Sequence, residues 1–314
     1  MQNTLKLVSY NIDGLPETLD LNDLPWLLKP IAWIYKLIKK TTIVVINDNV
    51  DKSRCIGDIS EYLLESDADI IGIQEDFNYH DTVAGPLRGL YHEGTYMGGF
   101  DLSKIFSSAE WWSCFPLPRF KADGLGFFSK RGLTEIEGED IKRWKKSYGY
   151  FTHANDKLTH KGFRHYEVKV ESKTLDIYVL HMDADFYNPE SCPDVSGDIK
   201  ARKCQLKQLV KYIIDRKNSG VDNPAIIMGD TNSGTYEWDV ENINEYLLKP
   251  INSENGLSIE EVMPDNMVDV DRAFLVNNEA SRCKLVSEGG HYNAEMDGKS
   301  DHRPFEFKVA IKQS

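Results

Sequence analysis

Residues 225–232 read AIIMGDTN, a short apolar run that ends abruptly in polar side chains. Residues 225–228 have the length and composition of a buried β-strand. Asp230 and Asn232 follow at the point where that strand should end. The same arrangement recurs along the chain, where other apolar runs also stop at a residue that can bind a metal ion or a phosphate. This repeated pattern determines the fold we expect and the place where we expect a functional site.

Other apolar runs of strand length lie between turn or polar residues: 5–10, 69–73, 125–128, 175–180 and 305–311. The alternation of Tyr166, Val168 and Val170 indicates a further, half-buried strand. Apolar side chains at helical spacing predict two amphipathic helices, through Ile56, Ile59 and Leu63 and through Leu206, Leu209, Val210 and Ile213. Because strands and helices are interspersed, the sequence predicts an α/β (α+β) layered sandwich.

Nothing in the sequence marks a domain boundary, since it has no internal repeat, low-complexity tract or linker rich in proline and serine. We therefore expect residues 1–314 to form a single domain. Two stretches, near 12–53 and 77–123, are rich in Pro, Gly, Asn and aromatic residues and are expected to be long loop insertions. Loops of this length in a compact domain are often functional, so we expect them to carry substrate specificity.

The charge of the chain bears on its partners. With 37 basic and 50 acidic side chains the formal net charge is −13, which repels a polyanion at long range. This balance favours a small or locally bound substrate. Nucleic acid stays an alternative, because a basic patch or a bound cation can overcome the mean field locally. No sequence feature indicates a protein partner.

The cellular compartment stays open. No secretory signal follows Met1, so we expect a soluble protein that is either cytoplasmic or secreted or periplasmic with its signal peptide absent from this chain. The apolar stretch 25–46 is a poor transmembrane helix, because a proline and several lysines interrupt it: Lys29, Pro30, Lys36, Lys39 and Lys40.

Polar residues follow several of the predicted strands. Alone, each is more often a turn, cap or solvated residue than a functional one. Together they point to one cleft, because strand ends at one edge of a sheet lie close in space: Asn11, Glu75, His181, Asp230, Asn232, Asp301 and His302. Hydrolysis of a phosphodiester needs a cation, a base that activates water, and donors for the phosphate oxygens. Carboxylates such as Glu75 suit Mg²⁺.

These residues lie in five motifs: Tyr10-Asn11-Ile12, Ile73-Gln74-Glu75, Leu180-His181, Gly229-Asp230-Thr231-Asn232 and Ser300-Asp301-His302. In this order the motifs resemble those of the endonuclease/exonuclease/phosphatase superfamily, and they span residues 10–302. The resemblance implies a four-layer sandwich of two packed mixed β-sheets flanked by helices. It also implies a divalent-metal-dependent phosphoesterase that hydrolyses a phosphodiester by metal- and histidine-assisted attack of water. Mg²⁺ is the expected ion, with Mn²⁺ or Ca²⁺ as alternatives.

The resemblance also implies roles for single residues. Glu75 would be the principal metal ligand, with Asn11 and Asp301 as further metal contacts. The phosphate would be bound by Asn11, His181 and Asn232. The catalytic set would be His181, Asp230, Asn232, Asp271 and His302.

Two of these assignments carry alternatives. His302 would be a general base or a phosphate contact, with its ring oriented by Asp271, or by Asp269 if the alignment slips. The general base would be Asp230 or His302.

Two branches of this superfamily share further features with the chain. The segment 151–163, which contains Lys161-Gly162, and the acidic loop that leads into 202–213 resemble neutral sphingomyelinases. Thr231 and the segment 11–15 resemble tyrosyl-DNA phosphodiesterases instead. We therefore favour a sphingomyelinase-like phosphodiesterase over a nuclease, and a phosphate-ester substrate that is a lipid headgroup or small diester over nucleic acid. A non-catalytic binding protein of the same fold is a second alternative, against which the full set of polar residues stands.

Three segments bear on membrane or nucleic-acid contact. Residues 142–146 read KRWKK, four cations around a tryptophan, which suits phosphate groups or a solvated strand. Residues 26–40 interleave aromatic and aliphatic side chains with lysines. They are compatible with peripheral membrane contact, although a helix packed on its own domain is the more common case. Trp111 and Trp112 are compatible with three roles: a tip that faces lipid, a wall on which substrate stacks, or part of the buried core.

Overall fold

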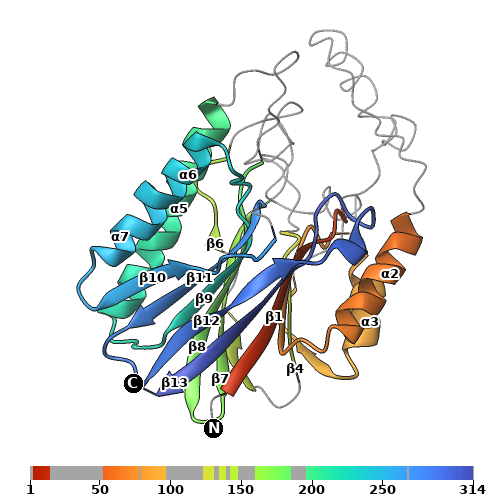
Figure 1. Cartoon of the computed structure of the whole chain (residues 1–314), viewed down its shortest axis with the longest axis horizontal. Helices are drawn as coiled ribbons and strands as arrows, with labels where there is room; N and C mark the ends of the chain where they lie inside the picture. Colours follow the sequence, from red (N-terminus) through yellow and green to blue (C-terminus); the bar gives the residue numbers. More distant parts are fainter. Residues whose placement is uncertain are drawn as a thin grey trace, which may run out of the picture.

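The computed structural model describes residues 3–14, 52–77, 79–96, 123–130, 134–138, 142–147, 160–184, 196–266 and 269–313. Two mixed β-sheets pack face to face within these residues (Figure 1). The first sheet has the order β12 (Cys283–Tyr292), β13 (Phe305–Gln313), β1 (Asn3–Asn11), β2 (Ile70–Gln74), β4 (Gly126–Lys130) and β3 (Tyr91–Glu93). The second has the order β10 (Leu257–Glu261), β11 (Asp271–Asn278), β9 (Ala225–Asp230), β8 (Lys173–His181), β7 (Gly162–Val170) and β5 (Thr134–Gly138). A short strand, β6 (Lys142–Arg143), also pairs with β7.

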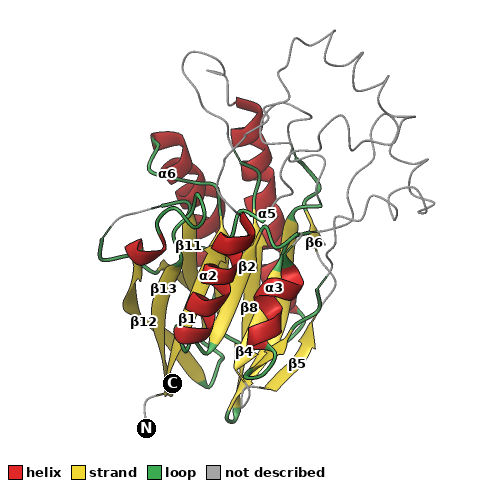
Figure 2. Cartoon of the chain, turned by 90° about the vertical axis from the view of Figure 1, so that its right-hand side faces the viewer, coloured by secondary structure: helices red, strands yellow, loops and turns green. Residues whose placement is uncertain are grey.

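Helices cover the outer face of each sheet. The first sheet is covered by α2 (Lys52–Glu65) and α3 (His80–Leu87), which lie in front of the strands in Figure 2. The second sheet is covered by α5 (Ser196–Asn218), α6 (Glu237–Ile243), the π-helix η2 (Asn244–Leu248) and α7 (Lys249–Asn252). A 3₁₀ turn, η3 (Ala294–Met296), precedes β13. The result is the predicted four-layer sandwich. No helix in the described part of the chain is long and apolar enough to span a membrane.

The inner faces of the two sheets form the main core. Leu7 and Phe307 of the first sheet meet Val179 and Met228 of the second in one buried cluster. On the outer faces, Ile59 and Leu63 of α2 and Leu206 and Leu209 of α5 form two further clusters. All six positions of β9 are buried because both faces of this strand are covered, which explains its continuous apolar sequence. The strands and helices predicted from apolar periodicity are therefore confirmed.

The stretch 77–123 was expected to be a loop, and the described part of it corrects this expectation. Helix α3 and strand β3 lie within it. Pro86 and Gly85 make α3 a poor helix by intrinsic propensity. Tertiary packing instead stabilises it, since Val83 and Leu87 are fully buried against the first sheet. Residues 15–51 and 97–122, including Trp111 and Trp112, lie outside the described residues, as do the expected membrane contacts of 26–40.

An ion pair joins the two sheets between their inner faces. Asp123 stands just before β4 of the first sheet and Arg164 lies on β7 of the second, and both side chains are fully buried. Arg164 donates through Nε, at 2.9 Å, and through Nη2 to Asp123 Oδ2. The other oxygen, Oδ1, accepts from the Leu125 backbone at 2.9 Å. The two charges therefore compensate each other across the sheets, and the Asp123 carboxylate is also held by its own loop.

The substitution Arg164→Met should lower the free energy of unfolding by about 3–5 kcal/mol, because it leaves Asp123 buried without its cation. Urea denaturation followed by circular dichroism measures this loss. The double variant Asp123→Leu/Arg164→Met removes both charges and should recover most of the stability. A double variant that is no more stable than Arg164→Met would contradict this account.

Candidate active site

The candidate site forms where strand ends from both sheets meet. Asn11 is the last residue of β1, His181 of β8 and Asp230 of β9, and Asp271 is the first residue of β11. In the second sheet Asp230 lies opposite both His181 and Asp271 in the strand pairing. Each of these side chains continues a row of inner-face core residues, such as Val179 before His181. The site therefore lies at one edge of the sandwich interior.

Asp230 is at the centre of this arrangement. Its Oδ2 accepts hydrogen bonds from Asn11 Nδ2 at 3.0 Å and Asn232 Nδ2 at 3.1 Å, and its Oδ1 accepts from the Asn232 backbone at 2.8 Å. His181 Nε2 lies 3.3 Å from the same Oδ2. Burial raises the pKa of Asp230, but the contact with His181 and the positive charge of His302 outweigh it and hold this pKa well below its ordinary value. Asp230 is thus an anion whose lone pairs are largely used.

The backbone on both sides of Asp230 has little freedom. Gly229 has a φ of +142°, and a Cβ there would lie 2.1 Å from the Leu180 carbonyl oxygen. Only glycine permits this close approach of β9 to β8. Asn232 has a φ of +47°, and its Nδ2 also donates to the Met182 carbonyl at 3.0 Å. The GDTN motif is therefore a tight strand end that aims Asp230 and Asn232 into the site.

Asn11 connects the two sheets across the site. Its Nδ2 is 3.0 Å from Asp230, 3.4 Å from Glu75 Oε1 and 3.5 Å from His302 Nε2. An amide group has only two hydrogens to donate, so the two longer contacts are loose. Its Oδ1 faces away and accepts from the Asp13 backbone at 3.1 Å. In this orientation Asn11 is better placed to donate to a phosphate oxygen than to bind a cation.

His302 is held from two sides. Its Nδ1 lies 2.6 Å from Asp271 Oδ2, and its backbone N–H donates to Ser300 Oγ at 3.1 Å. Ser300 Oγ in turn donates to the Asn11 carbonyl at 2.7 Å. Burial lowers the pKa of His302, but the carboxylates of Asp271 and Asp230 raise it well above its ordinary value. For the acid Asp271, burial has the opposite sign and raises the pKa to about 7, although the positive charge of His302 acts against this shift.

The acidic partner of His302 is Asp271. Asp269, the competing residue in the sequence, uses its Oδ1 to accept from the Val270 backbone at 2.8 Å. The ring of His302 presents Nε2 toward the site, where it is 3.8 Å from Asp301 Oδ1 and 4.0 Å from Asp230 Oδ2. The side chain of Asp301 is 72% exposed, so it lies at the outer mouth of the site.

Glu75 follows β2 in a left-handed conformation, with a φ of +58°. Its Oε1 is 3.7 Å from His181 Nε2, and its side chain is only 14% exposed. Burial raises the pKa of Glu75 to about 7, and Lys161 acts against this shift. A largely buried carboxylate with loose partners is stabilised when a cation binds beside it. The oxygen donors and the charge of Glu75 therefore fit a hard divalent cation.

Asp230, Asp271 and His302 also offer three potential ligand atoms within 4.8 Å of one another. Their hydrogen bonds to Asn11, Asn232 and each other use most of these atoms. These three side chains therefore belong to one network of polar contacts, which Asn11 joins to the Glu75 carboxylate.

Sequence reasoning did not select two residues that contact the site. Lys161 is 7% exposed and its Nζ donates to the Met182 carbonyl at 3.3 Å. Its charge lowers the pKa values of Glu75, His181 and Asp230. Burial, followed by Lys161, lowers the pKa of His181 to about 4, so this imidazole is neutral near pH 7. In the sequence, the Lys161-Gly162 pair was visible only as part of the segment that resembles neutral sphingomyelinases.

Trp144 is the other residue that sequence reasoning did not place at the site. It is 6% exposed and packs on Phe163, with 5.3 Å between ring centroids. Its Nε1 donates to the His181 carbonyl at 2.7 Å. The tryptophan of KRWKK is therefore part of the support of the site and does not project to solvent.

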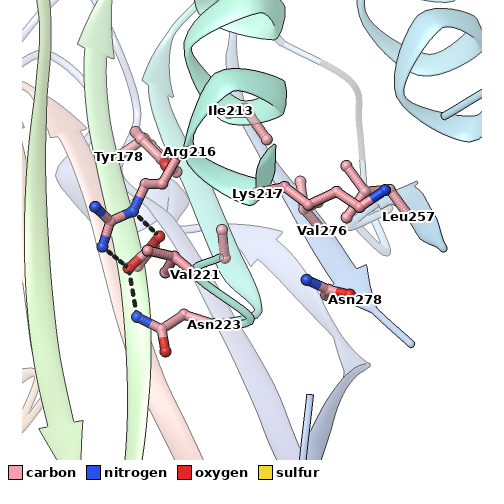
Figure 3. Close-up of a pocket in the computed structure, with 11 residues that line it drawn as sticks. Tyr178, Ile213, Arg216, Lys217, Val221, Asn223, Leu257, Val276 and Asn278 are labelled. Carbon is pink, nitrogen blue, oxygen red and sulfur yellow. Dashed lines mark hydrogen bonds and ion pairs between the residues drawn. The ribbon is translucent and has the colours of Figure 1, made fainter. Parts of the chain in front are cut away.

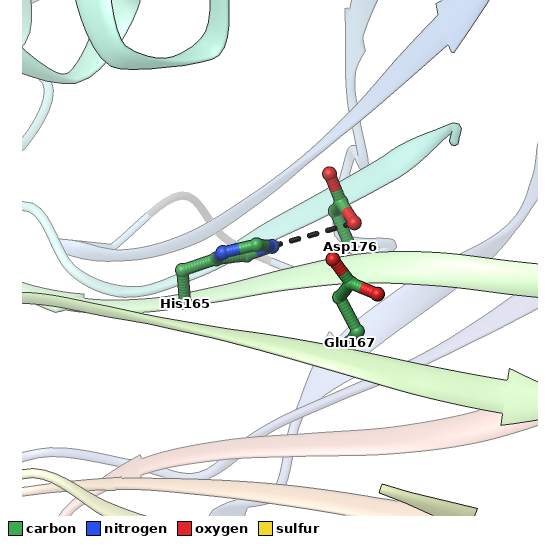
Figure 4. Close-up of side chains that lie close together, drawn as sticks. All are labelled: His165, Glu167 and Asp176. Atoms are coloured by element: carbon green, nitrogen blue, oxygen red, sulfur yellow. Dashed lines mark ion pairs between the residues drawn. The ribbon is translucent and has the colours of Figure 1, made fainter. Parts of the chain in front are cut away.

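A second group of metal-binding residue types lies on the outer face of the second sheet: His165, Glu167 and Asp176 (Figure 4). Arg216 of α5 already binds both carboxylates, with Nε 2.5 Å from Asp176 Oδ2. Asn223 donates to the same Asp176 at 3.0 Å, beside a small pocket (Figure 3). Because the guanidinium of Arg216 occupies both carboxylates, the group anchors α5 to the sheet and is not a candidate metal centre.

Comparison with known proteins gives a family and a fold. The model of the Endonuclease/Exonuclease/phosphatase family matches residues 8–302. No curated protein matches the chain in sequence. Three solved structures share the fold at low sequence identity.

The first is a beta toxin mutant from Staphylococcus aureus with bound magnesium ions (TM-score 0.57, 17% identity, 99% of this chain and 100% of that chain). The second is sphingomyelinase C from Streptomyces griseocarneus, with a TM-score of 0.57 and 13% identity over 99% of this chain and 100% of that chain. The third is D. rerio TDP2 complexed with single strand DNA product, with a TM-score of 0.57 and 12% identity over 98% of this chain and 99% of that chain. Each likeness extends over nearly the whole of both chains.

Proposed function

This chain belongs to the endonuclease/exonuclease/phosphatase family and is a phosphoric ester hydrolase, and from this premise we propose that it cleaves a phosphodiester of a choline-type membrane lipid, as a sphingomyelinase does. The observation that carries the hydrolytic part is the convergence of Asn11, Glu75, Asp230 and His302. The amide of Asn11 lies within 3.5 Å of polar atoms of the other three. Two of these contacts join residues more than 200 positions apart in the chain.

Glu75 is the residue we propose to hold a divalent cation, with Asp301 at the mouth of the site as a further ligand. When bound, such an ion offsets charge on the nonbridging phosphate oxygens and favours ionisation of the attacking water. Mg²⁺ is the first choice because the donors are oxygens and the site opens to solvent on the Asp301 side. The magnesium-containing structure of the same fold supports this choice. Mn²⁺ and Ca²⁺ are the alternatives.

His302 is the residue we propose as general base. Asp271 fixes its tautomer and orientation, so that Nε2 faces the site. Asp230 is the competing base, but it accepts three hydrogen bonds from Asn11 and Asn232 and its pKa is lowered. Its proposed role is to orient the amide of Asn11, which keeps a second hydrogen to donate to a phosphate oxygen, and to hold Asn232, whose Nδ2 already donates to Asp230 and to the Met182 carbonyl. Positive charge held near Glu75 would return His302 toward the neutral form that accepts a proton.

His181 and Lys161 are proposed to act on the phosphoryl group. Lys161 supplies a positive charge deep in the site, where low solvent exposure strengthens it. His181 is 1% exposed, and neither of its ring nitrogens makes a hydrogen bond within the described residues, although Nε2 lies 3.3 Å from Asp230 Oδ2. A neutral imidazole of this kind can donate to or accept from a ligand oxygen. Together they would stabilise charge that develops on the phosphate in the transition state.

The lipid substrate is favoured by two observations. The segment that resembles neutral sphingomyelinases contributes Lys161, whose charge lowers the pKa of Glu75 and of His181. The net charge of −13 opposes binding of a long polyanion. The fold shared with sphingomyelinase C and beta toxin supports this choice, whereas the likeness to TDP2 supports a nuclease as the second candidate.

A substrate panel tests the proposed function. With Mg²⁺ we expect release of phosphocholine from sphingomyelin, measured by a coupled choline assay, and much less cleavage of oligonucleotides and inositol phosphates. Cleavage of oligonucleotides without phosphocholine release would favour the nuclease. Absence of turnover on every member, including a nitrophenyl diester, with Mg²⁺, Mn²⁺ and Ca²⁺, would favour a non-catalytic protein.

The substitution Glu75→Gln keeps the size of the side chain and removes its charge, so divalent-cation affinity should fall by more than about 100-fold, because a direct ligand matters more than an outer-shell one. Isothermal titration with Mg²⁺ measures this affinity, and turnover should be lost in parallel. The matched control is Glu260→Gln on the exposed face of β10, which should titrate like the unmodified chain. An unchanged Mg²⁺ titration of Glu75→Gln would remove Glu75 from the metal site.

The substitution His302→Ala should lower kcat by about 10²–10⁴-fold, the usual contribution of a general base. Steady-state kinetics on the substrate found in the panel measures it, and KM should change little. His92→Ala serves as control, since His92 is exposed on β3. A kcat of His302→Ala close to that of the control would exclude His302 as the base.

A further inference from the structure

Helix α5 carries a row of lysines on its solvent-facing side. Lys200, Lys203, Lys207 and Lys211 are spaced by three or four residues and so lie along one face of the helix. Lys200, Lys207 and Lys211 are exposed, and Lys203 is half-buried. The opposite face, through Leu206, Leu209 and Ile213, packs on the second sheet. The row is therefore presented outward by a helix that is fixed in place.

A second group of cations lies on the segment of β6 and the residues after it. Arg143, Lys145 and Lys146 are exposed on either side of the buried Trp144. This segment is bound to α5 through its backbone. Gln208 accepts from the Lys145 N–H at 2.9 Å and donates to the Arg143 carbonyl at 2.8 Å, and Gln205 donates to the Lys146 carbonyl at 2.8 Å. The two groups are thus joined through Gln205 and Gln208 of α5, and we call them together the basic face.

The basic face has few internal counterions. Lys211 pairs with Asp215, but Arg143, Lys145, Lys146, Lys200, Lys203 and Lys207 form no ion pair with any residue that the structure describes. Lys203 and Lys207 lie 5.4 and 4.8 Å from the ring centroid of Tyr246, a contact that does not neutralise their charge. In a chain with a net charge of −13, seven cations on one helix and the segment bound to it are a local excess of positive charge.

The basic face begins beside the active site. Trp144, between its cations, donates to the carbonyl of His181. At the start of α5, Arg202 donates to the carbonyl of Asp183, two residues after His181. Any partner held by the basic face is therefore held next to the catalytic strand ends.

We propose that the basic face docks the enzyme on an anionic phospholipid surface, which would place membrane-borne substrate at the site. This inference deepens the proposed function and rests on it for the identity of the substrate. Clusters of four to eight Lys and Arg side chains are attracted to anionic headgroups, at about 1 kcal/mol per cation. The charges are spread along a helix and an adjoining segment, and six of the seven are lysines, which act as point charges without the fork geometry of arginine.

Nucleic acid suits this surface less well. Proteins that bind single strands combine cations with exposed aromatic side chains on which bases stack. The aromatic residue within the cationic segment, Trp144, is instead buried against Phe163. Among the described residues, the ring that the basic face does offer, Tyr246, is half-buried and already lies beneath Lys203 and Lys207. The basic face therefore offers mainly charge, as a headgroup surface requires.

Binding to vesicles tests the proposal without any catalytic turnover. The probes are vesicles of phosphatidylcholine alone and of phosphatidylcholine mixed with phosphatidylserine, with no sphingomyelin and no divalent cation. We expect the full chain to co-sediment with the mixed vesicles only, and to be released by high salt, which screens exposed charges. The quadruple variant Lys145→Gln/Lys146→Gln/Lys200→Gln/Lys207→Gln should bind at least about tenfold more weakly.

The control removes the same number of exposed lysines far from the basic face: Lys169→Gln, Lys284→Gln, Lys308→Gln and Lys312→Gln together, on β7, β12 and β13. It should bind as the unmodified chain does, and thermal unfolding should show that both variants are folded. Equal weakening by the two quadruple variants, or no binding by the unmodified chain, would overturn the proposal. Tighter binding to oligonucleotides than to vesicles, lost only in the basic-face variant, would overturn it in favour of nucleic acid.

These outcomes are independent of the substrate panel. Failure of phosphocholine release with intact vesicle binding would refute the proposed substrate and leave the docking surface standing. Failure of vesicle binding with intact phosphocholine release would refute the docking surface and leave the proposed substrate standing.

Discussion

The buried carboxylate of Asp230 is the constraint on which the rest of the site depends. A charge held in the protein interior costs several kcal/mol unless hydrogen bonds and opposite charge compensate it. The compensation comes from Asn11 in the first sheet and from Asn232, His181 and His302 at other points of the chain. These partners meet only when the two sheets pack in the observed register. The contacts that compensate this anion therefore also fix the positions of the side chains in the candidate site.

The same network divides the chemistry among the residues around it. Asp230 uses its lone pairs to orient amides, and Asp271 orients His302, so neither carboxylate is as available to a cation as Glu75. Glu75 has only loose contacts, although it is largely buried. Lys161 adds one buried positive charge to this acidic cluster. At the surface, in contrast, the cations on α5 and after β6 have few counterions among the described residues, although the whole chain is strongly acidic.

Much of the fold could be predicted because local patterns reflect burial. The strands β8 and β9 are covered on both faces, so their apolar runs were visible, and α2 and α5 show helical spacing of apolar residues. Helix α3 and strand β3 were missed, since a short helix containing proline depends on what it packs against. Strand β12 was missed too, because it mixes buried and exposed positions and contains a bulge between Ser287 and Gly290.

The sequence by itself determined which chemical groups follow which strands, and hence the family and the residues Asn11, Glu75, His181, Asp230, Asn232, Asp301 and His302 as candidates. Only the tertiary structure decided that Asp271, and not Asp269, orients His302, that Trp144 is buried, and that Lys161 joins the site. Apolar periodicity is a property of a few neighbouring residues. Contacts between residues far apart in the chain depend instead on strand register and on how two sheets pack, which no local pattern encodes.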